Sequence, residues 1–374
     1  MKKVVPVQSP KQLAAFIDFV HELYKDDPNY VPELFIAQRD LLTPGKHPFH
    51  EHSSLQTFLA YDGDKIVGRI AAILNNNHNT FNNVKEGFFG FFDSVNDTEV
   101  ATLLFNAATD WLKEKGVNNI IGPVNFSTNE TCGLLIDGFD TPPVAMMTYN
   151  APYYSSLIEQ RGFGKKTDLL AYEFVAGSYD DSRLNNVLHV LEERLKRRNI
   201  TIRQINLKDF KGEVAKIREV YNSAWDKNLG FVPMTEKEFT YLANDLKMIM
   251  DPDLCLVAEH EGKMIGFALA IPDVNEILIK IKKGRLFPTG LFKLLTQKKK
   301  IKGIRIITLG VIEGYRKTGV ENFFYATFIK HYRAKNLQRA EASWILEDNL
   351  LMNKAIQGIN GKPYKKYRIF EKAI

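Results

Sequence analysis

Hydrophobic and polar positions follow the same order in two distant parts of the chain. Residues 58–73 (FLAYDGDKIVGRIAAI) and 256–271 (LVAEHEGKMIGFALAI) align without a gap, and each predicts a strand, a turn and a second strand. Five of the sixteen aligned pairs are identical, namely Ala60/Ala258, Lys65/Lys263, Gly68/Gly266, Ala72/Ala270 and Ile73/Ile271. The offset of these pairs, 266 minus 68, is 198. One match of this kind can arise by chance, so the neighbouring elements decide whether the chain is duplicated.

The elements around the two hairpins repeat in the same order. The first half predicts a strand, a helix, the hairpin and an apolar strand, at residues 4–8, 11–24, 58–73 and 88–92. The second half predicts the same series with one more helix, at residues 200–205, 210–222, 236–248, 256–271 and 304–311. Each apolar strand leads into a helix that we expect to end at Gly116 or Asn336, residue types that accept a left-handed backbone. These ordered matches predict an internal duplication.

Each half carries its own insertion. The offset grows to 220 at the pair Gly116/Asn336 and returns to 199 at the pair Gly162/Gly361. The second half therefore has extra residues between 271 and 304, and the first half has its own at about 126–143. Because 374 residues exceed what one hydrophobic core organises, we predict domains at 1–175 and 176–374, joined by an amphipathic helix over 183–198.

Composition narrows the class of protein. Hydrophobic residues make up 45% and charged residues 25% of the chain, as in ordinary globular proteins. We find no apolar run of about 18 residues and no targeting segment, so we expect a cytoplasmic protein. Cys132 and Cys255 lie far apart, one in a Gly/Asn/Thr-rich segment and the other in an apolar strand pattern, so neither a disulfide framework nor a cysteine metal site is indicated. The net charge of +6 comes mostly from lysines and arginines between Lys280 and Arg305, without a nucleic-acid-binding motif.

The most specific motif is LGVIEGYRKTGV at residues 309–320, between a predicted strand and a predicted helix. This turn is similar to the Arg/Gln-x-x-Gly-x-Gly/Ala turn of the GNAT acyltransferase superfamily, and the order of elements resembles that family twice along the chain. The resemblance implies an α/β fold (α+β by some schemes) of two tandem GNAT-like domains. Each would contain a mixed, mostly antiparallel sheet flanked by helices.

That resemblance implies a site for an acyl-CoA donor, acetyl-CoA or a longer acyl-CoA, in the second repeat. Its pyrophosphate would bind at Arg316, Lys317, Thr318, Gly319 and Val320, where helix amides and cations can solvate phosphate. The backbone of Val311 would bind the acyl oxygen, and Asn349 would contact the coenzyme arm. Glu321 departs from the pattern, because it stands where a second small residue belongs.

The first repeat carries a different turn at the same place. Residues 92–100 read FDSVNDTEV, which contains three carboxylates and neither a glycine nor a cation. We expect Asp97 and Glu99 to cap the following helix and to repel a pyrophosphate. The sequence therefore predicts that only the second repeat binds an acyl-CoA.

The chemistry implied by the family requires a base and often a tyrosine that protonates the leaving thiolate. The usual carboxylate of the fourth strand is absent, because residues 306–309 read IITL. Glu347 and Asp348 are the predicted bases, although paired acids at a strand end are often only solvated loop residues. Tyr364 is the predicted proton donor to the thiolate.

Two segments are predicted to bind the acceptor. Trp225, Asn228 and Phe231 lie between the two early helices of the second repeat, where the family forms its acceptor pocket, although packing of the aromatic rings is an equal alternative. Asn125 and Asn129 belong to the polar insertion of the first repeat, which we expect to reach across to that pocket.

A metal site is not predicted. His47, His50 and His52 are close in the sequence, but Pro48 separates the first two and neither a cysteine nor a fourth ligand accompanies them. A polar or substrate-facing segment before the hairpin fits these residues better.

The leading functional prediction is an N-acyltransferase that moves an acyl group, acetyl or longer, from acyl-CoA to a small primary amine. The alternatives are a non-catalytic acyl-CoA or ligand-binding protein, and a Fem-type aminoacyl or long-chain acyl transferase at a membrane surface. Residues 279–302 alternate lysines with large apolar residues, which favours contact with a membrane surface or an acidic acyl carrier protein. A solvated basic face is the alternative.

Overall fold

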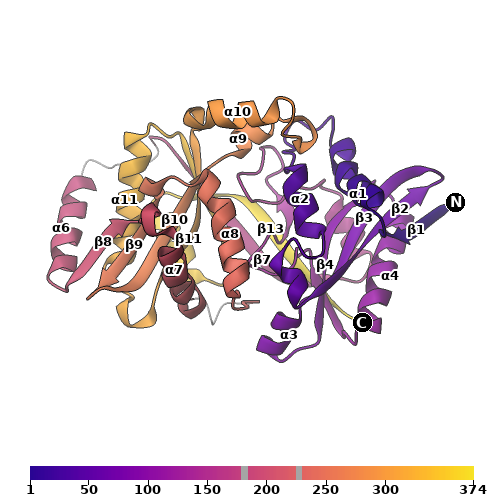
Figure 1. Ribbon diagram of the computed structural model, residues 1–374, viewed down its shortest axis with the longest axis horizontal. Helices are drawn as coiled ribbons and strands as arrows, with labels where there is room; N and C mark the ends of the chain where they lie inside the picture. The colour runs from indigo at the N-terminus through magenta and orange to yellow at the C-terminus, as the bar shows by residue number, and fades with distance from the viewer. Residues whose placement is uncertain (178–183, 225–229) are drawn as a thin grey trace.

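A computed structural model describes residues 1–177, 184–224 and 230–374 of the chain. These residues form one mixed sheet of 13 strands, covered by helices on both faces (Figure 1). The first repeat occupies one half of the molecule and the second repeat the other half (Figure 1). The predicted α/β fold, in which a mixed sheet is flanked by helices, is therefore confirmed.

The first repeat supplies seven strands and five helices of the described chain. Its strands are β1 (Lys2–Pro6), β2 (Ser54–Asp62), β3 (Lys65–Leu74), β4 (Glu86–Ser94), β5 (Asn119–Gly122), β6 (Leu134–Asp137) and β7 (Gly164–Val175). Its helices are α1 (Pro10–Leu23), α2 (Phe35–Leu42), α3 (Asn76–Asn82), α4 (Thr98–Glu114) and α5 (Tyr154–Glu159).

The second repeat supplies the remaining elements. Its strands are β8 (Ile200–Gln204), β9 (Cys255–His260), β10 (Lys263–Pro272), β11 (Gly303–Val311), β12 (Arg339–Leu346) and β13 (Lys362–Ala373). Its helices are α6 (Leu184–Lys196), α7 (Phe210–Ala224), α8 (Glu236–Ile249), α9 (Asn275–Leu278), α10 (Gly290–Gln297), α11 (Val320–Ala334) and α12 (Leu350–Gly358). The amphipathic helix predicted between the halves is thus confirmed as α6.

The two repeats exchange their last strands. The order across the sheet is β1-β2-β3-β4-β5-β13-β7-β12-β11-β10-β9-β8, with β6 paired to β13. Strand β13 of the second repeat lies against β5 of the first, while β7 of the first lies against β12 of the second (Figure 1). Because β13 and β7 also pair with each other, one continuous hydrogen-bonded sheet joins both halves. The domain boundary at residue 175 therefore remains a prediction from the sequence.

The residues that match between the two repeats have a structural reason. Gly68 and Gly266 occupy the same place in hairpins β2–β3 and β9–β10, where a neighbouring strand approaches closely. An ideal Cβ on Gly68 lies 3.3 Å from the Asp93 carbonyl oxygen, and one on Gly266 lies 2.9 Å from that of Gly310. Gly116 and Asn336, with φ of 76° and 50°, end the following helices in the left-handed conformation as predicted.

The insertion of the second repeat connects the two halves. It contains α9 and α10 and lies above the junction between them (Figure 1). Its Arg285 guanidinium contacts both carboxylate oxygens of Asp18 at 2.8 Å and stacks on the Phe35 ring at 3.4 Å. Across the described ranges, none of the helices combines the length and apolarity needed to cross a membrane.

Candidate functional site

Strands β11 and β12 begin as a parallel pair and then separate. Their register runs only from Gly303↔Arg339 to Ile306↔Ala342, although both strands continue for several residues. Parallel strands that part in this way leave backbone and side chains free to face a ligand. The separation therefore marks the place where the second repeat can bind one.

A cavity lies on each side of this separation. The first, which we name the α11 cavity, has a volume of about 680 Å³ and is lined by α6, α11, α12 and the two strands. The second, the α7 cavity, has a volume of about 530 Å³ and is lined by α7, α8 and the strands. It also takes residues from the insertion of the first repeat, which sequence reasoning expected to reach this place. Both volumes lie in the range of small-molecule sites.

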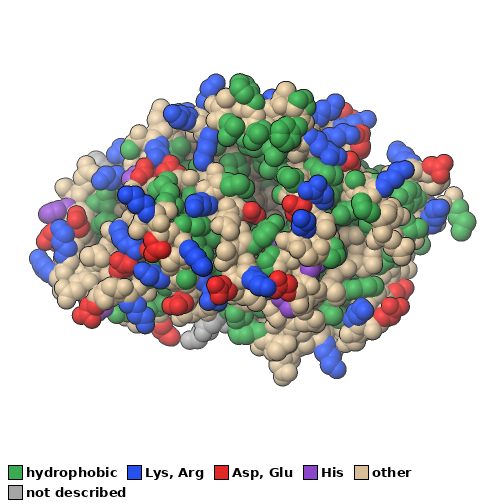
Figure 2. Space-filling model, in the orientation of Figure 1, with side chains coloured by type: hydrophobic (Ala, Val, Ile, Leu, Met, Phe, Trp, Pro, Cys, Tyr) green, Lys and Arg blue, Asp and Glu red, His purple; other side chains and the backbone are tan. Residues whose placement is uncertain are grey.

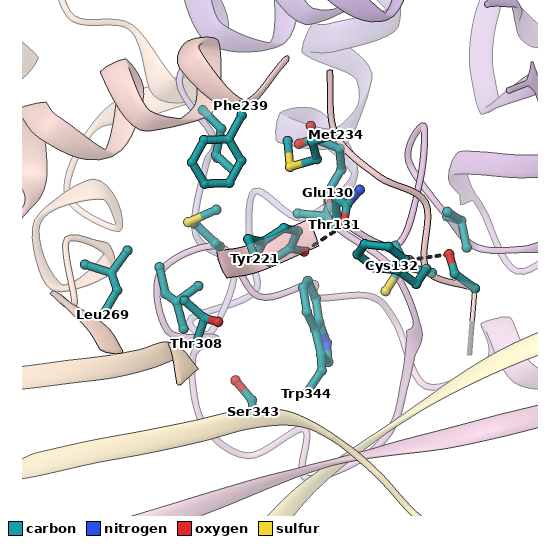
Figure 3. Close-up of a pocket in the computed structure, with 18 of the residues that line it drawn as sticks. Glu130, Thr131, Cys132, Tyr221, Met234, Phe239, Leu269, Thr308, Ser343 and Trp344 are labelled. Atoms are coloured by element: carbon teal, nitrogen blue, oxygen red, sulfur yellow. Dashed lines mark hydrogen bonds between the residues drawn. The ribbon is translucent and has the colours of Figure 1, made fainter. Parts of the chain in front are cut away.

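The two cavities meet at the separated strands. Five residues line both of them, namely Ile307, Thr308, Ser343, Trp344 and Leu346. Thr308 Oγ1 and Trp344 Nε1 are buried and have no hydrogen-bond partner among the described residues. Leaving such a group unpaired costs about 1–3 kcal/mol, so each is suited to bond a ligand instead. Figure 3 shows these two side chains and Ser343 near the strands.

A buried acid, Glu341, contacts this junction through Ser343. Ser343 Oγ donates to Glu341 Oε1 at 2.6 Å and accepts from Arg305 Nε at 3.1 Å. Glu341 is fully buried and also accepts from the Tyr364 hydroxyl. The Arg305 guanidinium lies 4.8 Å from the centre of the Trp344 ring. A serine hydroxyl can accept two hydrogen bonds, so one acceptor position of Ser343 remains for a ligand.

The predicted phosphate turn forms a 3₁₀ helix (Glu313–Tyr315), a left-handed Gly319 with φ of 110°, and the start of α11. No side chain caps this helix end, so its first amides can face an anion. Lys317 is exposed, and Thr318 donates to the Tyr315 carbonyl oxygen. Val320, the first residue of α11, is fully buried.

The arginine that approaches that turn is not the one predicted from the sequence. Arg316 turns away from the helix end, because its guanidinium donates to the carbonyl oxygens of Val311 and Ala224 at 3.2 and 3.1 Å. Arg194 of α6 approaches instead, with its Nη2 3.4 Å from the Lys317 carbonyl oxygen. Its Nε also lies 3.9 Å from an ideal Cβ on Gly319. Sequence reasoning missed Arg194, since it belongs to a helix far from the motif along the chain.

The other predicted donor-site and catalytic residues are dispersed. Asn349 lines the α11 cavity and caps α12 through Met352 N, whereas Val311 is packed in the core and lines neither cavity. Glu347 pairs with Lys165 at 2.7 Å and accepts from Asp168 N. Asp348 is exposed, and Tyr364 lines neither cavity but contacts Glu341. The roles predicted for them stay predictions.

The insertion of the first repeat reaches the α7 cavity. Asn129 accepts from the Tyr221 hydroxyl at 2.7 Å and donates to the Val232 carbonyl oxygen at 3.0 Å, both in the second repeat. Phe231 lines the cavity beside it, while Trp225 and Asn228 lie outside the described residues. Asn125 stays within the first repeat, where its side chain accepts from Phe91 N.

Glu130 is the acid of this insertion. It lines the α7 cavity and lies 4.0 Å from His47 Nε2. Burial, with the nearby carboxylates Glu238 and Asp245, raises the pKa of Glu130 to about 7. Figure 3 shows Glu130 away from Ser343, on the other side of Tyr221. Neither Glu130 nor the Glu341–Ser343 pair was predicted, although an acid at a buried position of strand β12 was a signal for the latter.

The three histidines each have a separate partner. His47 Nδ1 bonds to Phe49 N, His50 Nε2 to the Leu41 carbonyl oxygen, and His52 Nε2 to Glu238 at 2.9 Å. In the parts of the chain that the structure describes, no group of three or more His, Cys, Asp or Glu side chains is arranged to hold a metal ion.

Comparison with known proteins gives two relatives over nearly the whole chain. The chain is 37% identical to "Protein YghO" of Escherichia coli K12 over 369 residues, 97% of this chain and 93% of that protein. It is 34% identical to "Bacterial ceramide synthase" of Caulobacter vibrioides over 381 residues, 99% of this chain and 97% of that protein. No family model matches the chain.

Solved structures of similar fold confirm the predicted architecture of two tandem GNAT-like units. A tandem GNAT protein from the clavulanic acid biosynthesis pathway superposes with a TM-score of 0.58 and 10% identity, covering 100% of this chain and 98% of that one. A GCN5-related N-acetyltransferase from Sphaerobacter thermophilus gives a TM-score of 0.54 and 12% identity, covering 100% and 95%. At such identities the likeness concerns the fold alone.

Proposed function

We infer a function for this chain from its family, because it belongs with protein YghO and the bacterial ceramide synthase and has the fold of tandem GNAT proteins. We propose that it is an acyl-CoA-dependent N-acyltransferase whose acceptor is a long-chain amine of the sphingoid-base type. The observation that carries the proposal is the meeting of two cavities at Thr308, Ser343 and Trp344. A transferase requires such a point, where donor and acceptor touch.

The α11 cavity suits the acyl-CoA donor. It lies beside α11, whose N-terminus is free of side-chain caps and has Lys317 and Arg194 close by. Phosphate is favoured at such a helix end by the free amides and by the positive end of the helix dipole. The apolar lining of the cavity would take the pantetheine and acyl chain towards the separated strands.

The α7 cavity suits an acceptor with a long hydrocarbon chain. Its lining from α7 and α8 is largely apolar and includes Ile217, Phe239, Leu242 and Leu246. Polar groups gather only where the first repeat and the strands enter it, as at Asn129 and Ser343. A molecule with an apolar chain and a compact amino-alcohol head matches this division, which the name of the ceramide synthase relative independently supports.

The proposed reaction needs two proton transfers at the site. The ammonium group of the acceptor first loses a proton to water, and the neutral amine nitrogen then attacks the thioester carbonyl carbon. The C–S bond breaks, and the products are an amide and the coenzyme A thiol. As the C–N bond forms, the amine proton passes to Ser343 Oγ while the Ser343 proton passes to Glu341, 2.6 Å away. The coenzyme leaves as thiolate and takes up one proton from the hydroxyl of Tyr325, which lines the α11 cavity and is the proposed donor. Exchange with water then removes the proton from Glu341 and returns one to Tyr325.

The unpaired donors at the junction would stabilise the negative charge that develops on the thioester oxygen. Trp344 Nε1 and Thr308 Oγ1 are buried, so hydrogen bonds from them act with little competition from water. This assignment replaces the backbone of Val311, which lines neither cavity. The Arg305 guanidinium lies against the Trp344 ring and would support its orientation.

The experiment combines purified protein, palmitoyl-CoA or acetyl-CoA, and sphinganine, with amide measured by mass spectrometry and thiol by a colour reagent. We expect N-palmitoyl-sphinganine and an equal amount of free thiol. Replacing Ser343 by alanine should lower kcat by about 10²- to 10⁴-fold, the range for a lost proton relay, and leave palmitoyl-CoA affinity unchanged. Ser156→Ala, at an exposed serine of α5, is the matched control.

Three results would contradict parts of this proposal. Unchanged kcat in Ser343→Ala and Glu341→Gln excludes the proton relay. Tight binding of palmitoyl-CoA without amide formation from any long-chain amine supports the non-catalytic alternative. An absence of thermal stabilisation by every acyl-CoA tested excludes the donor site altogether.

A further inference from the structure

The insertion that contains α10 exposes an apolar face. Phe287, Phe292 and Leu295 retain 76%, 70% and 73% of their surface, and Leu291 is partly exposed beside them. Figure 2 shows hydrophobic side chains gathered at the top of the molecule, over α9 and α10. The opposite side of the same insertion is already buried, because Ile277, Ile281 and Ile301 pack together with Leu294. The exposed set is therefore additional to what the insertion needs for its own packing.

Positive charge borders this face. Residues 277–303 contain nine lysines and arginines and no aspartate or glutamate. Lys283 and Arg285 pair with Glu22 and Asp18 of the first repeat, but within the described ranges Lys299 and Lys300 form no ion pair. Figure 2 shows basic side chains on both sides of the apolar patch. A bilayer with anionic head groups complements both features at once.

The face is held in a fixed position. Gly284 has φ of 60° and packs so tightly that an ideal Cβ would lie 1.8 Å from the Glu33 carbonyl oxygen. With the Arg285–Asp18 pair, this contact fixes the segment against α1 and α2. A rigid helix with large apolar side chains on its outer surface loses little conformational entropy when it enters an interface.

We propose that α10 and the preceding Phe287 dock this protein on the surface of an anionic membrane. The apolar side chains enter the boundary between head groups and acyl chains, and the lysines bind lipid phosphate. An acidic carrier protein would pair with the lysines but would leave four large apolar side chains without a matching partner. The membrane accounts for both.

The position of this face relative to the cavities deepens the proposed function, on which this step rests. A further cavity of about 340 Å³ lies between α1, α2 and α9, and Val274, Asn275 and Leu278 of the insertion line it. It shares Thr131, Cys132 and Met146 with the α7 cavity. The insertion that carries the docked face thus also borders a cavity that shares part of its wall with the α7 cavity.

The test is co-sedimentation of the full-length protein with vesicles of phosphatidylcholine alone or of phosphatidylcholine and phosphatidylglycerol in a two-to-one mixture. We expect binding to the anionic vesicles that weakens with added salt. The triple substitution Phe287→Ser, Phe292→Ser, Leu295→Ser should reduce the bound fraction at least tenfold, and Lys299→Glu with Lys300→Glu should reduce it severalfold. Val190→Ser, at a 65% exposed valine of α6, is the matched control.

Equal binding by the wild type and the triple variant overturns the proposal, as does binding to purified acyl carrier protein but not to vesicles. A second measurement separates this outcome from failure of the proposed function. Acyl transfer from palmitoyl-CoA to sphinganine dispersed in a neutral detergent, without vesicles, should be the same in the wild type and the triple variant. If that activity is absent in both while vesicle binding persists, the function fails and the docking surface stands.

Discussion

Strands β4 and β5 of the first repeat and β11 and β12 of the second start as matching parallel pairs, and both pairs then part. In the first repeat the gap is closed. Val124 N donates to the Phe89 carbonyl oxygen, and Phe91 N donates to Asn125 Oδ1. An ideal Cβ on Gly90 would lie 2.5 Å from the same Asn125 atom. In the second repeat the gap is open and is bordered by Thr308 Oγ1 and Trp344 Nε1, which have no hydrogen-bond partner among the residues that the structure describes.

Helices α4 and α11, which follow strands β4 and β11, also differ in whether a side chain caps their first amides. Asp97 caps α4 through the amides of Glu99 and Val100 and also accepts from Lys2 at 2.6 Å. Gly319 begins α11 without a side-chain cap. The first repeat has therefore satisfied its own backbone groups, whereas the second leaves them for a ligand.

The comparison teaches that one copy of a duplicated fold can fill the gap between its strands while the other copy keeps cavities beside it, without a change in the order of elements. The first repeat then contributes in another way, because Asn129 and Glu130 of its insertion line the cavity of the second. The cavity that we propose for the acceptor is thus lined by residues of both repeats.

The largest expected effect comes from giving the second repeat the carboxylate of the first. Gly319→Asp should weaken acyl-CoA binding by about tenfold or more, since a negative charge at the helix end opposes phosphate and competes for the same amides. Titration calorimetry with coenzyme A measures the effect. Gly314→Asp is the control, because it adds the same charge in open space five residues away. Equal affinity in both variants would place the phosphate elsewhere.

A smaller effect should show whether the first repeat contributes to binding of the acceptor. Glu130, with a pKa raised to about 7, is uncharged below that pH and anionic above it. An amine acceptor is a cation throughout this range, so its attraction to Glu130 is absent at pH 6 and present at pH 8. We expect the acceptor KM to fall severalfold between these pH values, and to stay constant in Glu130→Gln.

Steady-state kinetics in the wild type, Glu130→Gln and the surface control Glu51→Gln measure this dependence. A KM that responds to pH equally in all three proteins would show that Glu130 does not face the acceptor. In that case the insertion would serve only to join the repeats through Asn129.

The smallest expected effect concerns stability alone. Asp97→Ala removes the cap of α4 and should lower the free energy of unfolding by about 1 kcal/mol, the usual cost of a lost N-cap. Chemical denaturation measures the loss, and coenzyme A affinity should not change. A shift in that affinity would mean that the first repeat also takes part in binding the donor.

Much of the fold was predictable because it rests on local patterns. The hairpins, the helix ends at Gly116 and Asn336, and the carboxylate cap at Asp97 follow from periodicity and from the conformations that individual residue types accept. Asn129 was predictable as a residue of a long polar insertion, although its partners Tyr221 and Val232 were not. The candidate site was harder to predict from the sequence, because its residues come from segments that lie together only in the folded sheet.

The sequence by itself determined the duplication, the element types and the difference between the two turns, since each depends on residues close together along the chain. The tertiary structure decided the exchange of β7 and β13, the side to which Arg316 turns, and the meeting of Thr308, Ser343 and Trp344 with Glu341 behind them. Those features depend on which strand pairs with which and on which polar atoms lose water. Contacts between residues far apart along the chain fix both, and no local pattern encodes them.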